Sequence, residues 1–220
     1  DMGLDRTDPS LALAGYSGHE VRIDYALMNN RVFVNNLSLG LYAAAVQQPE
    51  YRDNKLSTLT SMLSEHSEPF DLQFIGPNGV KYETAQMLLV SNNPYTLSDR
   101  LLDVGKRYSV NTGKLGVAGL AVTTTADMEK FVAMAALGRF KNHPGWMEWT
   151  TDSITIEAKG GIIPVGVDGE ALEIPSPMVC RIVPDGLRLM LLEGITPGMP
   201  RTPGMFDRFT LMRLWNVAIK

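Results

Sequence analysis

The sequence has few of the residues that stabilise a protein through covalent cross-links or metal ions. Cys180 is the single cysteine, so no internal disulfide bond can form, and a reducing, cytoplasmic location fits best. The three histidines are scattered without the spacing of a zinc site, which is therefore not expected. No apolar run approaches the roughly 18 residues that indicate a membrane-spanning helix.

An excess of positive charge is also lacking. The 220 residues include 20 Lys and Arg against 24 Asp and Glu, which gives a net charge of −4. Nucleic-acid-binding proteins usually present a basic face, so nucleic acid is not an expected partner. With 45% hydrophobic and 20% charged residues, the composition is that of a folded globular protein.

The patterns that are present indicate mostly strands. Between residues 19 and 27, the apolar residues Val21, Ile23, Tyr25 and Leu27 occupy alternate positions, which predicts a half-buried strand with these residues on its apolar face. Similar strand patterns occur at residues 31–35, 71–75, 80–90, 114–122, 147–157, 164–167, 171–175, 178–183 and 187–192. Helical spacing occurs at residues 39–46, 55–66 and 125–137. The predicted fold class is mainly β (α+β), an antiparallel two-sheet β-sandwich with a few attached helices.

Three short turns separate pairs of these predicted strands. Asn78-Gly79, Asp168-Gly169 and Asp185-Gly186 combine residues that tolerate a positive φ, which is typical of tight hairpins. The Asp168 turn follows an apolar run and is followed at once by Glu170. Without further context, Asp168 and Glu170 would be interpreted as solvated acids of a turn.

Four segments, in order, resemble the C-terminal part of bacterial lipid kinases of the diacylglycerol kinase type, which are relatives of sphingosine kinases and NAD kinases. A strand followed by two asparagines leads towards a helix, a second strand ends in Ser-Asn-Asn-Pro-Tyr, a turn precedes an apolar strand, and an Asp-Gly-Glu element closes a hairpin. The segments are residues 31–40, 88–95, 110–117 and 165–170. The resemblance extends over roughly residues 1–193.

The resemblance implies a two-domain enzyme, of which this chain supplies the second domain. In such kinases a glycine-rich loop of the first domain holds the phosphates of ATP, and no such loop occurs here. Residues 1–18 are therefore expected to be the end of a missing N-terminal nucleotide-binding domain, residues 19–196 the β-sandwich, and residues 197–220 a tail with a helix. The implied activity is ATP-dependent phosphorylation of the hydroxyl of diacylglycerol or a similar lipid, with ATP and Mg²⁺ as cofactors of the whole enzyme. The chain alone is expected to be inactive.

The resemblance also implies candidate site residues. Asp168 and Glu170 are candidates for the base that accepts the proton of the lipid hydroxyl, and the sequence does not order them. The asparagines at the ends of the two strands, Asn35, Asn36, Asn92 and Asn93, are expected to line the substrate cleft. Relatives bind Mg²⁺ near the turn that corresponds to Asn111-Thr112. Because this turn lacks a carboxylate, which hard cations prefer, occupancy by Mg²⁺ is not expected there.

Two other functions remain open at the level of the sequence. One is a non-catalytic β-sandwich module for lipid binding or dimerisation, and the other is an NAD kinase-like activity on a soluble substrate. The tail around residues 205–215 is apolar, aromatic and mildly basic, so it could lie on a membrane as an interfacial helix, or dock on its own domain or on a second copy in a homodimer. The first arrangement would place a cytoplasmic protein at the membrane periphery, next to its lipid substrate.

Overall fold

The computed structural model describes residues 18–41, 43, 69–96 and 107–191. The expectations for residues 1–17, for the helix at 55–66 and for the tail at 197–220 lie outside the described residues. None of the helices among the described residues has the length and apolar composition that a membrane span requires.

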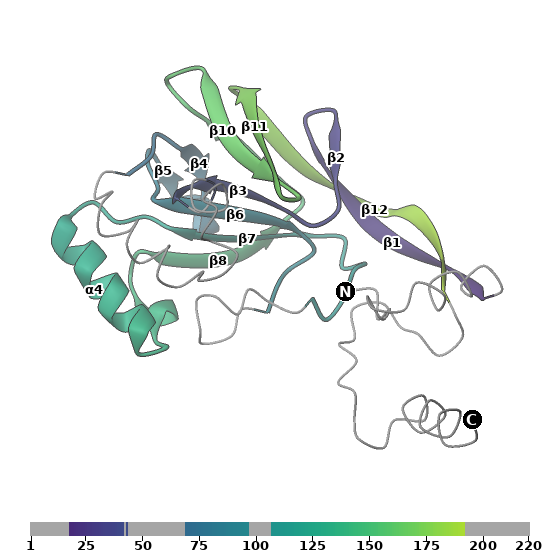
Figure 1. Ribbon diagram of the computed structural model, residues 1–220, viewed down its shortest axis with the longest axis horizontal. Coiled ribbons are helices and arrows are strands. Elements are labelled where there is room, and N and C mark those ends of the chain that lie inside the picture. Colours follow the sequence, from purple (N-terminus) through teal and green to yellow (C-terminus); the bar gives the residue numbers. More distant parts are fainter. Residues whose placement is uncertain (1–17, 42, 44–68, 97–106, 192–220) are drawn as a thin grey trace, which may run out of the picture.

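Two antiparallel six-stranded sheets form the described part of the chain (Figure 1). The first sheet contains, in spatial order, β2 (Arg31–Phe33), β1 (His19–Met28), β12 (Met178–Leu191), β9 (Ser153–Glu157), β4 (Gln73–Ile75) and β5 (Lys81–Tyr82). The second contains β11 (Glu170–Pro175), β10 (Ile162–Val167), β3 (Asn36–Gly40), β6 (Met87–Asn92), β7 (Leu115–Leu120) and β8 (Trp146–Thr151). The prediction of a mainly β, two-sheet fold is confirmed.

One hydrophobic core lies between the two sheets. Buried residues alternate with exposed ones throughout β9 and over the first four residues of β10. Ile154 and Ile156 of the first sheet thereby join Ile163 and Val165 of the second. The buried cysteine, Cys180, belongs to the same core. Because both sheets contribute to one core, neither sheet can lose its partner without exposing apolar side chains to water.

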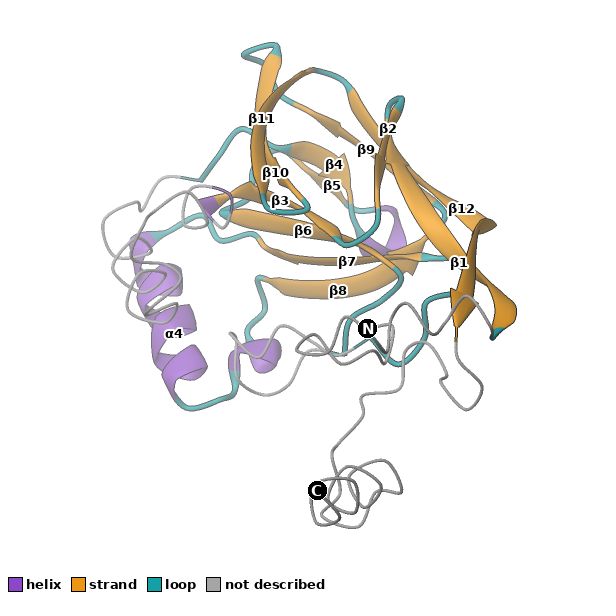
Figure 2. Ribbon diagram, turned by 45° about the vertical axis from the view of Figure 1, so that its right-hand side comes forward, coloured by secondary structure: helices purple, strands orange, loops and turns teal. Residues whose placement is uncertain are grey.

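The α-helix α4 (Thr125–Ala136) confirms the helix predicted at 125–137. The side chain of Thr124 caps it by accepting a hydrogen bond from the Asp127 backbone N–H at 3.1 Å. Met128 and Phe131 are its buried residues and belong to a second, smaller apolar cluster. The helix lies at the end of the molecule opposite to the long β1–β12 ribbon (Figure 2).

Two predicted strands are wrong in length because each is two strands in different sheets. The pattern at 147–157 divides at Asp152 into β8 and β9, and the pattern at 80–90 divides into β5 and β6. At Asp152 the backbone bends, and its carbonyl accepts a hydrogen bond from Ile182 N–H. Apolar periodicity continues through such a change of sheet because both strands face the same core, so the pattern alone does not reveal the break.

The first part of the helix predicted at 39–46 is also wrong, because Leu39 and Gly40 end strand β3. Gly40 has a φ of 68°, and a Cβ atom there would lie 2.4 Å from the carbonyl oxygen of Gln86. Only glycine fits at this position, because the backbone at Gln86 passes so close to it. Conversely, the strand predicted to end at residue 90 continues, since Ser91 and Asn92 still belong to β6.

The hairpin predicted at Asp185-Gly186 is wrong: residues 178–191 form the continuous strand β12. This strand pairs with β1 from Met28 to His19, where His19 lies opposite Leu191, and its register shifts between Ile23 and Tyr25. Asp185 has a φ of 51°, the positive value that the Asp-Gly pair predicts. This backbone conformation belongs to a β-bulge and not to a hairpin turn.

Beyond this bulge, the predicted apolar face of β1 is wrong as well. Asp24, Ala26 and Met28 are buried, at 1%, 0% and 1% exposure, whereas Tyr25 and Leu27 are only half-buried. The strand therefore turns a carboxylate into the interior.

Candidate active site

The acidic turn of the β10–β11 hairpin lies against the turn between β2 and β3. Asp168 has a φ of 49° and Gly169 one of 96°, which confirms the predicted tight turn. The Asp168 carboxylate accepts three backbone N–H groups: Val34 at 2.9 Å, Asn35 at 2.8 Å and Asn36 at 3.0 Å. In return, the Asp168 N–H donates to the Asn36 carbonyl at 3.0 Å. Asp168 thus fixes one turn to the other.

Glu170 has a different environment, although it is only two residues away. Its side chain is 70% exposed and accepts a hydrogen bond from Arg31 Nη2 at 2.8 Å. A surface ion pair of this kind contributes little to stability, on the order of 1 kcal/mol or less. It does orient the carboxylate, which stays accessible to a ligand.

A buried arginine that the sequence analysis missed organises the same region. Arg107 is 5% exposed and donates to the carbonyls of Val34 at 3.0 Å and Asn92 at 2.7 Å, and to Asn35 Oδ1 at 2.6 Å. Its guanidinium group also lies 5.1 Å from the ring centre of Tyr95. Burial lowers the pKa of Arg107, an effect that Tyr95 and Asp168 oppose. No motif at Arg107 signals this role, since its partners are 15 and 73 residues away in the sequence.

The four predicted cleft asparagines lie close together but are not equally accessible. Asn35 is exposed and Asn36 half-buried, and both contact the hydroxyl of Tyr95. Asn92 and Asn93 are 2% and 0% exposed. Asn92 Nδ2 donates to the carbonyls of residues 24 and 34, while Asn93 Oδ1 accepts from the N–H and the hydroxyl of Thr112. Asn92 and Asn93 therefore hold neighbouring segments together from the interior and are not accessible to a ligand.

Asp24 is a second residue that the sequence analysis missed as part of this region. Its two carboxylate oxygens accept the backbone N–H groups of Asp185 and Gly113, each at 2.8 Å. It thereby joins β1 to the β12 bulge and to the turn at 111–113. In the sequence, Asp24 is an acid inside a strand pattern, where alternation predicts that it faces outwards.

The donors around Asn111 and Thr112 do not fit a magnesium site. Asn111 Oδ1 accepts from Ser109 Oγ at 2.7 Å, and Thr112 Oγ1 lies 2.6 Å from Asn93 Oδ1. The nearby Lys114 ammonium group pairs with Asp152. Throughout the part of the chain that the structure describes, no three His, Cys, Asp or Glu side chains gather where a metal ion could bind. Protein groups thus already occupy the side-chain oxygens of Asn111 and Thr112.

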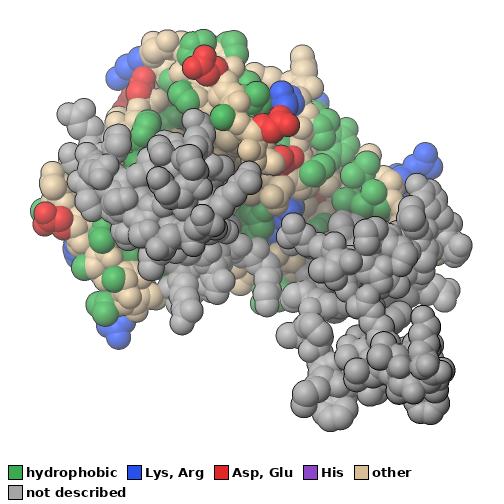
Figure 3. Space-filling model, in the orientation of Figure 1, with side chains coloured by type: hydrophobic (Ala, Val, Ile, Leu, Met, Phe, Trp, Pro, Cys, Tyr) green, Lys and Arg blue, Asp and Glu red, His purple; other side chains and the backbone are tan. Residues whose placement is uncertain are grey.

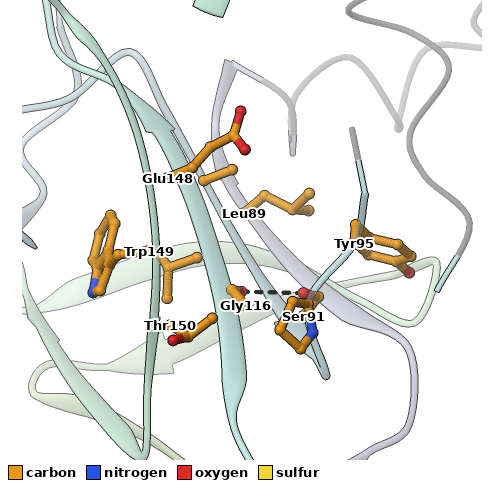
Figure 4. Close-up of a pocket in the computed structure, with 10 residues that line it drawn as sticks. Leu89, Ser91, Tyr95, Gly116, Glu148, Trp149 and Thr150 are labelled. Carbon is orange, nitrogen blue, oxygen red and sulfur yellow. Dashed lines mark hydrogen bonds between the residues drawn. The ribbon is translucent and has the colours of Figure 1, made fainter. Parts of the chain in front are cut away.

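A cavity of about 250 Å³ lies beside Tyr95 on the second sheet (Figure 4). Its walls come from β6, β7 and β8 and are mostly apolar, with Ser91, Glu148 and Thr150 as polar residues. Gly116 is required in its floor, since a Cβ atom there would lie 2.5 Å from the Cα of Pro94. Because Tyr95 contacts Asn35 and also lines the cavity, the cavity adjoins the acidic turn region.

On the face of the molecule shown in Figure 3, the described acidic and basic side chains are interspersed with apolar ones. No extended surface of one charge is visible there.

Comparison with solved structures identifies the fold. Three of the solved structures that the chain resembles come from Bacillus anthracis strain Sterne; two are provisionally described as a diacylglycerol kinase and one is described as a diacylglycerol kinase. The two provisional ones give TM-scores of 0.55 and 0.53 at 18% identity, covering 81% of this chain and 59% of theirs. The third gives a TM-score of 0.51 at 19% identity, covering 81% of this chain and 58% of its own.

This chain therefore spans less than two thirds of the length of the solved structures that it matches. No family model matches the sequence, and no curated protein matches it. The resemblance that the motifs predicted is confirmed at the level of fold: the chain has the β-sandwich fold found in solved diacylglycerol kinase-type structures.

Proposed function

We propose that this chain is the C-terminal domain of an ATP-dependent lipid kinase that phosphorylates the hydroxyl of diacylglycerol or a similar lipid. The observation that carries the proposal is the exposed carboxylate of Glu170 beside the pinned Asp168 turn, in a fold shared with diacylglycerol kinase structures. The mostly apolar cavity beside Tyr95 supports a lipid acceptor rather than a soluble one.

The two acids receive different roles in this proposal. Glu170 is the general base: it accepts the proton of the lipid hydroxyl as that oxygen bonds to the γ-phosphorus of ATP and the bond to ADP breaks. Asp168 is a positioning residue, because its carboxylate already accepts three backbone hydrogen bonds and holds the β2–β3 turn. ATP and its Mg²⁺ would be bound by a nucleotide-binding domain, and the described residues contribute the acceptor side.

The proposal is tested by labelled phosphate transfer from ATP to diacylglycerol with the complete natural reading frame. In the variant Glu170→Gln, an amide replaces the carboxylate and still accepts the hydrogen bond from Arg31, but it is no base. We expect kcat to fall by roughly 10²- to 10⁴-fold, the usual contribution of a general base. Glu173→Gln, on the same exposed strand, is the matched control and should leave transfer unchanged.

Each outcome of this experiment decides between functions. Full activity of Glu170→Gln would remove Glu170 as the base. A parent that transfers no phosphate to any of several lipids would favour the non-catalytic module for lipid binding or dimerisation. Lipid-independent phosphorylation of NAD would favour the NAD kinase-like activity. Asp168→Asn is a poor substitute for Glu170→Gln, because an asparagine cannot accept all three N–H groups and would alter the turn itself.

A further inference from the structure

The side-chain amide of Asn35 has one fixed orientation. Its Oδ1 accepts a hydrogen bond from Arg107 Nη2 at 2.6 Å and another from the Tyr95 hydroxyl at 2.5 Å. A guanidinium group has donors only, so the oxygen of the amide, and not its nitrogen, must face Arg107. The Tyr95 hydroxyl in turn accepts from Asn36 Nδ2 at 3.2 Å, which directs its own proton towards Asn35.

This orientation leaves the NH₂ group of Asn35 for an outside partner. The residue is exposed, and among the described residues its Nδ2 has no hydrogen-bond partner. The backbone N–H of the same residue donates to Asp168 Oδ1, so the amide stands beside the acidic turn. Buried Arg107 fixes the amide from one side and Tyr95 from the other, so little rotational freedom remains to be lost when a ligand binds.

From this geometry we infer that Asn35 is a preoriented hydrogen-bond donor for an oxygen atom of the lipid acceptor. The inference rests on the proposed function and assigns a specific contact with the substrate to one of the four asparagines predicted to line the cleft. A neutral donor suits an uncharged hydroxyl or ester oxygen. The Asn35 amide lies between the turn that carries Glu170 and Tyr95, which lines the mostly apolar cavity. The donor would hold the acceptor while Glu170 takes its proton.

Two substitutions separate the donor from the rest of the network. Asn35→Asp keeps an oxygen that accepts from Arg107 and Tyr95 but lacks the NH₂ group, and it adds a negative charge. Asn35→Ala lacks the NH₂ group without adding charge, but it also removes that oxygen. Both variants keep the backbone N–H that binds Asp168. Asn30→Asp, in the exposed β1–β2 turn, controls for added charge.

The measurement is steady-state phosphate transfer by the complete reading frame, with kcat and KM determined separately for diacylglycerol and for ATP, beside thermal unfolding of each variant. We expect both Asn35 variants to lose about tenfold in kcat/KM for the lipid, as for a lost ligand hydrogen bond, with KM for ATP unchanged. Asn30→Asp should behave as the parent.

Several results would overturn the inference. Parent-like lipid kinetics of both Asn35 variants would exclude the contact, and a loss restricted to Asn35→Ala, together with lower thermal stability, would show a structural role only. A loss in Asn35→Asp and in Asn30→Asp, but not in Asn35→Ala, would be an effect of charge. A change confined to KM for ATP would place the donor on the nucleotide. An inactive parent would overturn the proposed function and this role together, whereas an active parent with unaffected variants overturns this role alone.

Discussion

Acidic side chains have different roles in this molecule, depending on the groups that surround them. Asp24 and Asp168 use their carboxylates to accept backbone N–H groups, whereas Glu170 keeps an accessible carboxylate. The sequence predicted that Asp168 and Glu170 lie together, because they share a turn. It could not order them, because the three N–H groups that bind Asp168 are more than 130 residues away.

The lone cysteine gives a prediction for pH dependence. Burial in the core raises the pKa of the Cys180 thiol to about 12, so the folded chain should not react with a thiol reagent at pH 8 to 9. In the unfolded chain the thiol ionises near pH 8.5, so the unfolded state binds fewer protons above that pH. The free energy of unfolding should therefore fall as the pH rises from about 9 towards 12, by up to about 1.4 kcal/mol per pH unit from this group.

The measurements are reagent labelling of native chain and urea unfolding at several alkaline pH values, each with Cys180→Ala alongside. The variant should lack the part of the pH dependence that the thiol causes. Rapid labelling of the native chain at pH 8 would contradict the burial of Cys180.

At the scale of the elements, the β1–β12 ribbon depends on the buried acid in its bulge. Asp24→Asn retains one acceptor oxygen but directs an NH₂ group at the N–H of Gly113 or Asp185. One buried donor is then unpaired, and we expect the free energy of unfolding to fall by about 1–3 kcal/mol. Urea denaturation of the chain would show this as a lower midpoint with an unchanged slope.

The matched control for Asp24→Asn lies on the same strand. Glu20 is exposed and makes only surface ion pairs with Arg22 and Arg188, so Glu20→Gln should change stability by about 0.5 kcal/mol or less. Equal stability of Asp24→Asn and the parent would show that the bulge does not depend on this carboxylate.

Much of the strand content could be predicted from the sequence, but the assignment of strands to sheets could not. The turns at Asn78-Gly79 and Asp168-Gly169 were predicted at their places because their residues tolerate a positive φ. The same signal at Asp185-Gly186 predicts a turn wrongly, since a β-bulge can require the same positive φ as a turn. The break at Asp152 was missed because the strands on both sides of it face one core.

At the scale of the whole molecule, the shared core predicts one cooperative unit. Ile156 of the first sheet and Val165 of the second are both fully buried in it. We therefore expect the slowest amide hydrogens of β12 and of β7, which lie in different sheets, to exchange through the same global unfolding and to report the same free energy. Hydrogen exchange measured by NMR in the 220-residue chain checks this, and two clearly different free energies would mean that the sheets open independently.

The β1–β12 ribbon also has a mechanical consequence. His19 lies directly opposite Leu191, so the chain enters and leaves the sandwich on neighbouring strands at one end of the molecule. A second domain joined through both of these strands would be connected to the sandwich by two links that lie side by side. With two links, the joined domain could swing across the plane of the ribbon but could not rotate freely about either strand alone. A closing movement towards the sandwich would then follow one favoured direction.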